Sequence, residues 1–407
     1  GITQTIFVSK AEPDYSAIPD TNTLRLKGYS VYHYKKPYFD PITPLGRFSH
    51  TFLYTKENYT YSDNDGSSSF YSELAEFPEN VNSTFDSINH RKIENIISYS
   101  NFDYKDNLIK PKFLTYSFGI GIVSNRFTQD TITNTLTELN PQAELQLFLT
   151  KNLSIRGTGI YSYRSDNSSA YNLKGIMEAS LKKNELQISF NSLSSQAPWI
   201  YQNFYSNYFQ WNNEFQNQKF QELDLIYKRP LTQIRLKSGL IHDYLYFNQS
   251  VEPTQYNEAL TYFNIALSQG VRLGNFGFDF NFIYQGVSNS DILRVPKFYS
   301  NTKLFYTNTL FKSALELQLG FNVRYFSKYY ANNYMPALRS FYLQDEREFG
   351  NYPYIDLFVN AKIKRARLFF KYKQLNSSFM PMNYFSGPHY PNADASATFG
   401  VIWQLFN

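Results

Sequence analysis

Cysteine is absent from the 407 residues, which excludes disulfides, thiolate nucleophiles and cysteine-bound zinc together. Charged residues make up 18% of the chain, whereas soluble domains contain about 25%. No uninterrupted apolar run reaches the roughly 18 residues that a transmembrane helix needs. The net charge of +5 is spread along the chain without runs of Lys or Arg. These absences argue against a helical membrane protein and a nucleic-acid-binding protein as well.

Aromatic residues are abundant by contrast. They make up 19% of the chain, with 36 Tyr and 37 Phe but only 3 Trp, while the mean hydropathy stays negative at -0.45. A chain that is rich in aromatics, poor in charge and polar on average is typical of a protein with one lipid-facing and one water-facing surface. A segment that crosses a bilayer must pair its backbone groups internally, so without helices only a closed barrel remains.

Alternation with a period of two residues is the dominant pattern. Leu315, Leu317, Leu319 and Phe321 alternate with Glu316, Gln318 and Gly320. The stretches 114–122, 143–150, 276–284 and 355–364 alternate in the same way. Each runs for about ten residues, which is the length that a tilted strand needs to cross the hydrocarbon core.

The connections between these stretches are of two kinds. Short, often basic ones, such as Lys228-Arg229-Pro230 and Gly274-Asn275, alternate with long polar and aromatic ones, such as residues 329–351. Outer-membrane barrels have short periplasmic turns and long external loops in this order. The sequence therefore predicts an all-β, transmembrane, antiparallel up-and-down β-barrel of about 16 to 18 strands in a bacterial outer membrane.

Residues 46–407 are predicted to form this barrel, with about sixteen strands and with both ends on the periplasmic side. Residues 24–34 read as one further strand, which makes the count odd. We therefore expect further strands upstream of Gly1, or else a plug or a periplasmic tail within residues 1–45.

The last residues resemble the signal that outer-membrane barrels present to their insertion machinery. Thr398, Gly400, Trp403 and Leu405 occupy the positions of a polar residue, a glycine and two spaced hydrophobic or aromatic residues, and Phe406 follows. The alternative is a plain amphipathic strand.

On four segments the chain resembles a family of porins from Bacteroidota. They are GRFSHTFLY at 46–54, the segment around Phe70, WIYQNFYSNYFQWNNEF at 199–215, and YFSGPHYP with FGVIWQLFN at 384–407. The resemblance covers most of the chain from about residue 24 onward. It implies an outer-membrane barrel and says little about substrate, and members of the family tend to be longer at the N-terminus.

No catalytic, cofactor-binding or metal-binding site is predicted. The histidines show no HExxH motif and lie on separate segments, at positions 33, 50, 90, 242 and 389. Asp63-Asn64-Asp65-Gly66 does not match the register of a calcium-binding loop and favours a turn. No GxSxG motif occurs, so an enzyme is the weaker hypothesis.

Alternation also assigns charged residues to the inner face. The predicted pore-lining residues are Arg324, Lys362, Lys364, Lys371 and Lys373 on one wall, with Glu222, Asp224, Arg235 and Lys237 on another. Opposed walls of charge would set ion preference, so the basic wall predicts mild anion preference that reverses when Lys362 and Lys371 are changed together to Glu. The alternative is that these residues pair with one another or are simply hydrated.

The predicted function is a porin, a channel for passive diffusion of ions and small polar solutes. The expected partners are outer-membrane lipid, the barrel-insertion machinery and small polar solutes, and no cofactor or nucleic acid is expected. A barrel subunit of an outer-membrane secretion or uptake complex is the first alternative. A transporter of apolar substrates and a membrane-embedded hydrolase are further alternatives.

Overall fold

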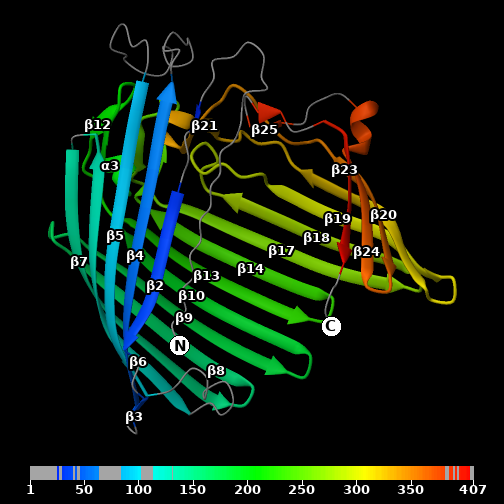
Figure 1. The fold of residues 1–407 in the computed structure, drawn as a ribbon, viewed down its shortest axis with the longest axis horizontal. Coiled ribbons are helices and arrows are strands. Elements are labelled where there is room, and N and C mark those ends of the chain that lie inside the picture. The colour runs from blue at the N-terminus through cyan, green and yellow to red at the C-terminus, as the bar shows by residue number, and fades with distance from the viewer. Residues whose placement is uncertain are drawn as a thin grey trace.

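The computed structural model describes residues 25–26, 30–39, 42–43, 46–63, 84–101, 113–130, 132–380, 385–387, 390–391 and 394–403. Within these ranges no helix has the length and apolar composition to cross a membrane. One antiparallel sheet of nineteen strands dominates the structure (Figure 1). β1 (Arg25–Leu26) and β3 (Ile42–Thr43) are two-residue strands that pair with β4.

The other strands of this sheet pair with their neighbours in chain order. They are β2 (Ser30–Phe39), β4 (Gly46–Asp63), β5 (Thr84–Ser100), β6 (Leu114–Gln129), β7 (Ile132–Thr150), β8 (Leu153–Arg164), β9 (Ser169–Leu181), β10 (Asn184–Ser195), β13 (Gln218–Arg229), β14 (Thr232–His242), β17 (Leu260–Leu273), β18 (Phe276–Val287), β19 (Phe298–Leu310), β20 (Leu315–Phe326), β23 (Tyr354–Ile363), β24 (Ala366–Lys373) and β27 (Ser396–Trp403). The predicted all-β barrel architecture is confirmed, with sixteen long strands from β4 to β27.

β2 is the strand expected near residues 24–34, and its observed bounds lie further along the chain. It pairs with β4, and the register shifts between Pro37 and Phe39. Proline has no backbone N–H to donate to a ladder, so within sheets it is confined to edge strands, strand ends and bulges. Pro37 therefore suits a strand that pairs on one side only among the described residues.

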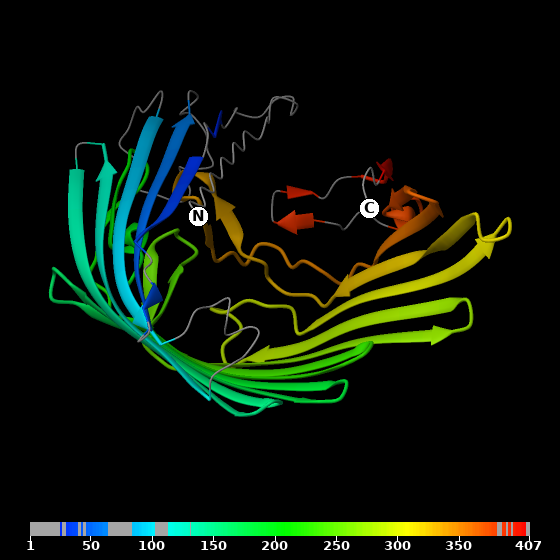
Figure 2. The same ribbon diagram turned by 60° about the horizontal axis from the view of Figure 1, so that its bottom comes forward.

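The sheet curls into a deep trough whose two rims are β2 and β27 (Figure 2). Neighbouring strands are antiparallel throughout, from β2–β4 to β24–β27. Because β2 to β27 form an odd series of strands, the two rim strands run in the same direction. Among the described residues no pairing joins β2 to β27.

The two ends of the strands differ as predicted. Two-residue turns connect β7 to β8, β13 to β14, and β17 to β18, whereas the connections at the other end span residues 196–217, 243–259 and 327–353. Two connections at the long-loop end are short. Residues 165–168 join β8 to β9, and two residues join β6 to β7, whose pairing continues to Gln129 and Ile132. β7 has 19 residues, more than the roughly ten that cross a bilayer, so this hairpin takes the place of a loop.

The long connections contain their own short elements. These are α3 (Trp199–Gln202), β11 (Asn203–Tyr205), β12 (Gln210–Asn212), β15 (Tyr244–Phe247), β16 (Pro253–Tyr256), β21 (Asn333–Met335), η1 (Pro336–Leu338), β22 (Ser340–Tyr342), η2 (Leu375–Ser378), β25 (Phe385–Gly387) and β26 (Tyr390–Pro391). β16, β15, β22 and β21 form a separate four-stranded sheet, built from two different connections. It lies inside the trough, on the side of β4 (Figure 2).

The ring of Phe305 on the inner face explains the glycine at position 277. Phe305 of β19 pairs directly with Gly277 of β18 and with Gly320 of β20. A Cβ atom at Gly277 would lie 2.1 Å from the Phe305 ring. The Arg272 guanidinium lies 5.1 Å from the centre of the same ring and pairs with Asp279 at 2.6 Å. The ring fills the space that the missing side chain at Gly277 leaves, an arrangement that stabilises glycine in a sheet.

Replacing Gly277 with Ala is therefore expected to destabilise the sheet by about 1–3 kcal/mol, the usual cost of overpacking. The measurement is urea-induced unfolding of the protein in lipid vesicles. Gly157→Ala is the matched control, because a Cβ atom at Gly157 meets nothing within 4 Å. Equal unfolding midpoints for the two variants would contradict the packing role of Phe305.

Candidate pore lining and loop core

The two faces of the sheet differ in polarity. Leu223, Leu236 and Phe321 expose 52%, 43% and 42% of their surface, as lipid-facing side chains do. Residues that pair directly across strands share a face, and alternate residues along one strand share a face. Tyr59 and Tyr61 pack against the connections inside the trough. Their face is therefore the concave one, and the register carries this assignment from strand to strand.

Four of the predicted pore-lining residues form ion pairs across β13 and β14. The Arg235 guanidinium donates two hydrogen bonds to Asp224, at 2.8 and 2.7 Å. Lys237 Nζ lies 2.9 Å from Glu222 Oε2, which also accepts a 2.6 Å hydrogen bond from the Tyr262 hydroxyl. A bidentate Arg–carboxylate pair is the strongest geometry for such a contact. The four charges therefore compensate one another within one wall.

A buried carboxylate organises the second predicted wall. Asp356 is 0% exposed, and its Oδ2 lies 2.8 Å from Lys371 Nζ and 3.9 Å from the Arg324 guanidinium. Its Oδ1 accepts the backbone N–H of Gln374 at 3.1 Å. Lys362 Nζ lies 3.7 Å from Glu316. Alternation located the cations but gave Asp356 and Glu316 no role, because a pair across two strands is visible only once the register is known.

The two remaining predicted residues differ from this pattern. Lys364 lies in the turn after β23, with a left-handed φ of 51°, and not within a strand. Lys373 ends β24 and forms no ion pair with any described residue. The structure thus pairs neighbouring charges inside each wall, where the alternation suggested uncompensated charge on opposed walls.

The predicted insertion signal falls on β27, one rim of the trough. Thr398 pairs with Lys371 and Gly400 pairs with Phe369, so both lie on the concave face. Trp403 lies on the other face and is 64% exposed. A Cβ atom at Gly400 would lie 2.5 Å from the Phe369 ring, which gives this glycine a packing role as well. Leu405 and Phe406 lie outside the described residues.

Four tyrosines near the loop end of the strands divide into two groups. Tyr161 and Tyr163 of β8 are exposed at the loop end of the sheet, as side chains of an interfacial girdle would be. Tyr244 and Tyr246 lie instead in β15 of the separate four-stranded sheet. The alternation over residues 244–247 is that of a strand, and it carries no sign of which sheet the strand joins.

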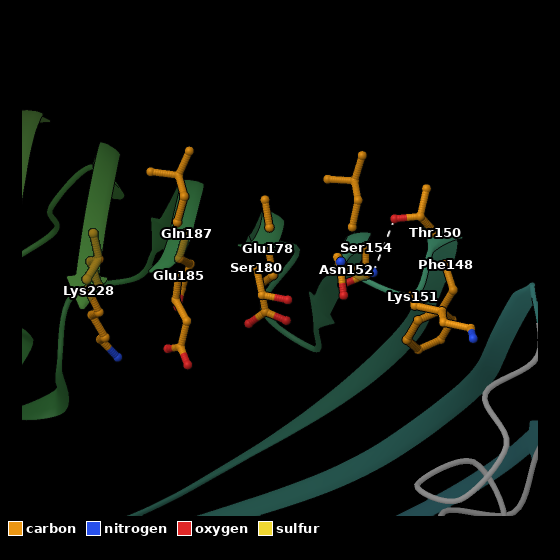
Figure 3. A pocket seen from close by; sticks show the side chains of 14 residues that line it. Phe148, Thr150, Lys151, Asn152, Ser154, Glu178, Ser180, Glu185, Gln187 and Lys228 are labelled. Carbon is orange, nitrogen blue, oxygen red and sulfur yellow. Dashed lines mark hydrogen bonds between the residues drawn. The ribbon is translucent and has the colours of Figure 1, made fainter. Parts of the chain in front are cut away.

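A depression of about 350 Å³ lies at the short-turn end of the concave face. Figure 3 shows its side chains in a row across neighbouring strands, with Glu178, Glu185 and Lys228 among them. Neither carboxylate forms an ion pair with a described residue, and the lining contains no histidine. The hydrogen bond drawn there, from the Asn152 N–H to Thr150 Oγ1 at 3.1 Å, closes the turn. Lys151 and Lys228 match the two carboxylates in number, so this depression is a polar surface without net formal charge.

The long connections form a compact core of their own, which we call the loop core. Phe204 is 0% exposed and Phe247 1%, and both pack against Tyr59 and Tyr61 of the β4 wall. Its buried members are Tyr59, Tyr61, Phe204, Tyr208, Phe209, Phe247, Val251, Met335, Ala337, Leu338 and Tyr342. Three separate connections and one strand therefore share a single hydrophobic cluster.

Polar contacts tie the loop core to the wall. Gln129 at the end of β6 donates a hydrogen bond to the Tyr205 carbonyl at 2.6 Å, and its own amide oxygen accepts the Tyr205 N–H at 3.3 Å. The Tyr59 hydroxyl donates to the Pro336 carbonyl.

Burial raises the pKa of Tyr201 from 10.0 to about 12. This phenol therefore supports the folded loops in its neutral form below about pH 10, and the support is lost as the pH rises toward 12.

A large curved antiparallel sheet with a polar inner and an apolar outer face defines an outer-membrane β-barrel. The chain belongs to the family described as "Putative porin", whose model matches residues 10–407. No curated protein matches the sequence. The family and the fold together make the chain a β-barrel of the bacterial outer membrane.

Solved outer-membrane structures share the fold at low sequence identity. A ferric enterobactin receptor, PfeA of Pseudomonas aeruginosa, is 12% identical with a TM-score of 0.60, over 87% of this chain and 56% of the receptor. The siderophore receptor PirA of Acinetobacter baumannii is 12% identical with a TM-score of 0.61, over 96% and 64%. The copper transporter OprC is 10% identical with a TM-score of 0.61, over 86% and 60%. The chain thus covers 56 to 64% of the length of these three proteins.

Replacing Phe204 with Ala is expected to open the loop core, because removing a buried Phe costs about 3–5 kcal/mol. Limited proteolysis is expected to cut connection 196–217 faster in the variant, while the heat-dependent gel mobility of the barrel stays unchanged. Phe341→Ala is the control, since Phe341 is 63% exposed on β22 of the same loop unit. Unchanged cleavage in the Phe204 variant would argue against a cooperative core.

Proposed function

We propose that this protein is a channel through which ions and small polar solutes diffuse passively across the outer membrane. The observation that carries the proposal is the concave face, where charged side chains are paired with neighbours on the same wall. Arg235–Asp224 and Lys371–Asp356 are the clearest pairs. Such a surface is polar but locally neutral, so it offers hydrated solutes few strongly attractive points. A transporter that holds its cargo would concentrate uncompensated groups at one site.

A barrel subunit of an uptake or secretion complex is the second candidate. The loop core favours it, because several connections fold inward against β4 and occupy part of the trough (Figure 2). The similar structures include receptors for ferric enterobactin and for siderophores. In either case we propose outer-membrane lipid and the barrel-insertion machinery as partners, the latter through Thr398, Gly400 and Trp403 of β27.

Conductance of the full-length protein in planar lipid bilayers separates the two candidates. A diffusion channel is expected to give discrete steps of open current that rise linearly with voltage. The control is the same protein heated before reconstitution, which should give no steps. Silence of correctly folded protein, judged by heat-dependent gel mobility, would favour the subunit of a complex.

Ion preference is best probed at lysines that take part in no ion pair, because reversing Lys371 would leave the buried Asp356 beside a like charge. Lys174 of β9 and Lys373 of β24 lie on the concave face and form no ion pair with described residues. Lys174→Glu combined with Lys373→Glu is expected to shift the anion-to-cation permeability ratio roughly twofold toward cations.

The reversal potential in a salt gradient measures this shift. Lys183→Glu combined with Lys312→Glu is the matched control, since it changes the net charge equally at two short turns. A shift of the same size in the control would mean that the total charge, and not the concave face, sets the preference.

A further inference from the structure

Two cavities of about 230 and 480 Å³ adjoin on the concave face, where the connection between β10 and β13 crosses the wall formed by β4 to β8. His90, Phe127 and Trp199 line both of them. His90 and Phe127 pair directly across β5 and β6, and Trp199 comes from α3, which lies beside these strands (Figure 1). Their combined size is in the range of small-molecule sites, about 300–1,000 Å³.

The three shared residues form a continuous ring stack. The His90 and Phe127 rings lie 4.2 Å apart at an interplanar angle of 3°. The Phe127 and Trp199 rings lie 5.2 Å apart at 7°. Parallel stacking covers the faces of the middle ring, Phe127, so the stack offers a ligand its ring edges and the outer faces of His90 and Trp199. The Trp199 indole N–H is buried and has no acceptor among the described residues.

Amides, hydroxyls and a few charged side chains surround the stack, and the Glu138 carboxylate is the lining group that has a hydrogen bond but no ion pair with a described residue. The Asn125 amide oxygen accepts a hydrogen bond from His90 Nε2 at 3.0 Å, and the Asn125 amide nitrogen donates to Glu138 Oε1 at 3.1 Å. Lys92 pairs with Glu94 at 3.0 Å, and Arg164 pairs with Asp166 at 2.5 Å. Serine hydroxyls and the amides of Gln196 and Gln202 complete the lining of the larger cavity. The site therefore combines an aromatic surface with many hydrogen-bonding groups and little free charge.

We propose that these cavities form a binding subsite for a neutral saccharide. A sugar ring presents a C–H face that packs on an aromatic ring and hydroxyls at its edge that need amide, hydroxyl and paired-ion partners. An ion would gain little where each charged side chain has a partner, and a purely apolar ligand would strip water from the amides without replacing it. The subsite rests on the proposed function in one respect. If the protein is a channel, the saccharide is a solute that passes through its lumen.

Binding is tested on full-length protein in a detergent without a sugar head group, with maltose and cellobiose as probes and gluconate as the charged counterpart. Isothermal titration is expected to show binding of at least one disaccharide and weaker or no binding of gluconate. Phe127→Ala should weaken disaccharide binding about tenfold or more, since it removes the middle ring of the stack. Phe127→Tyr keeps the ring and should retain binding.

Phe118→Ala is the matched control, because Phe118 lies on the same strand β6, on the opposite face, and is 51% exposed. It should bind like the unaltered protein. Trp199 lies in a connection and not in the wall, so Trp199→Leu provides a second test if Phe127→Ala fails to fold. Absence of disaccharide binding, unchanged binding in Phe127→Ala or Trp199→Leu, or tighter binding of gluconate would overturn the proposal.

A bilayer experiment separates the subsite from the channel. If the protein conducts, maltose or cellobiose added at the loop side is expected to interrupt the current in the unaltered protein and not in Phe127→Ala. If the protein is silent but still binds the sugar through Phe127, the channel proposal fails while the subsite stands. If it conducts and binds no sugar, the subsite fails alone.

Discussion

The pairing of every backbone N–H and C=O group inside the bilayer is the constraint on which this structure depends. Strands that satisfy it must lie side by side along their whole length, and this places alternate side chains on opposite faces. The outer face then has to be apolar and the inner face is free to be polar. Leu223 and Asp224 are adjacent in sequence, yet one is half exposed on the outer face and the other is buried in an ion pair.

The same geometry governs how charge is accommodated. The inner side chains of a strand reach those of the nearest one or two strands, so the described ion pairs of the wall join neighbouring strands. Asp224 meets Arg235 on the next strand, and Asp356 meets Lys371 and Arg324 on the strands to either side. Short polar contacts therefore link the strands of the described wall. The electrostatic field of its charged side chains falls off within a Debye length of about 8 Å at physiological salt.

Much of the wall was predictable from the sequence because alternation is a local signal. The facing of Arg324, Lys362 and Lys371 follows from their neighbours along the chain. The partners Glu316 and Asp356 do not, because they depend on the register between strands. The loop core was not predictable either: Phe204, Phe247 and Met335 lie in three connections whose meeting is a matter of tertiary packing. Nor does alternation distinguish β15, which joins a small sheet inside the trough, from a strand of the wall.

The shared core of the connections has a consequence for how the mouth of the barrel behaves. Phe247 touches Tyr201 and Trp211 from a different connection, at ring separations of 4.6 and 5.9 Å. No one of these segments is able to leave without exposing apolar surface on the others. The three connections that share this core should therefore move together, because displacing one of them exposes the apolar side chains of the others.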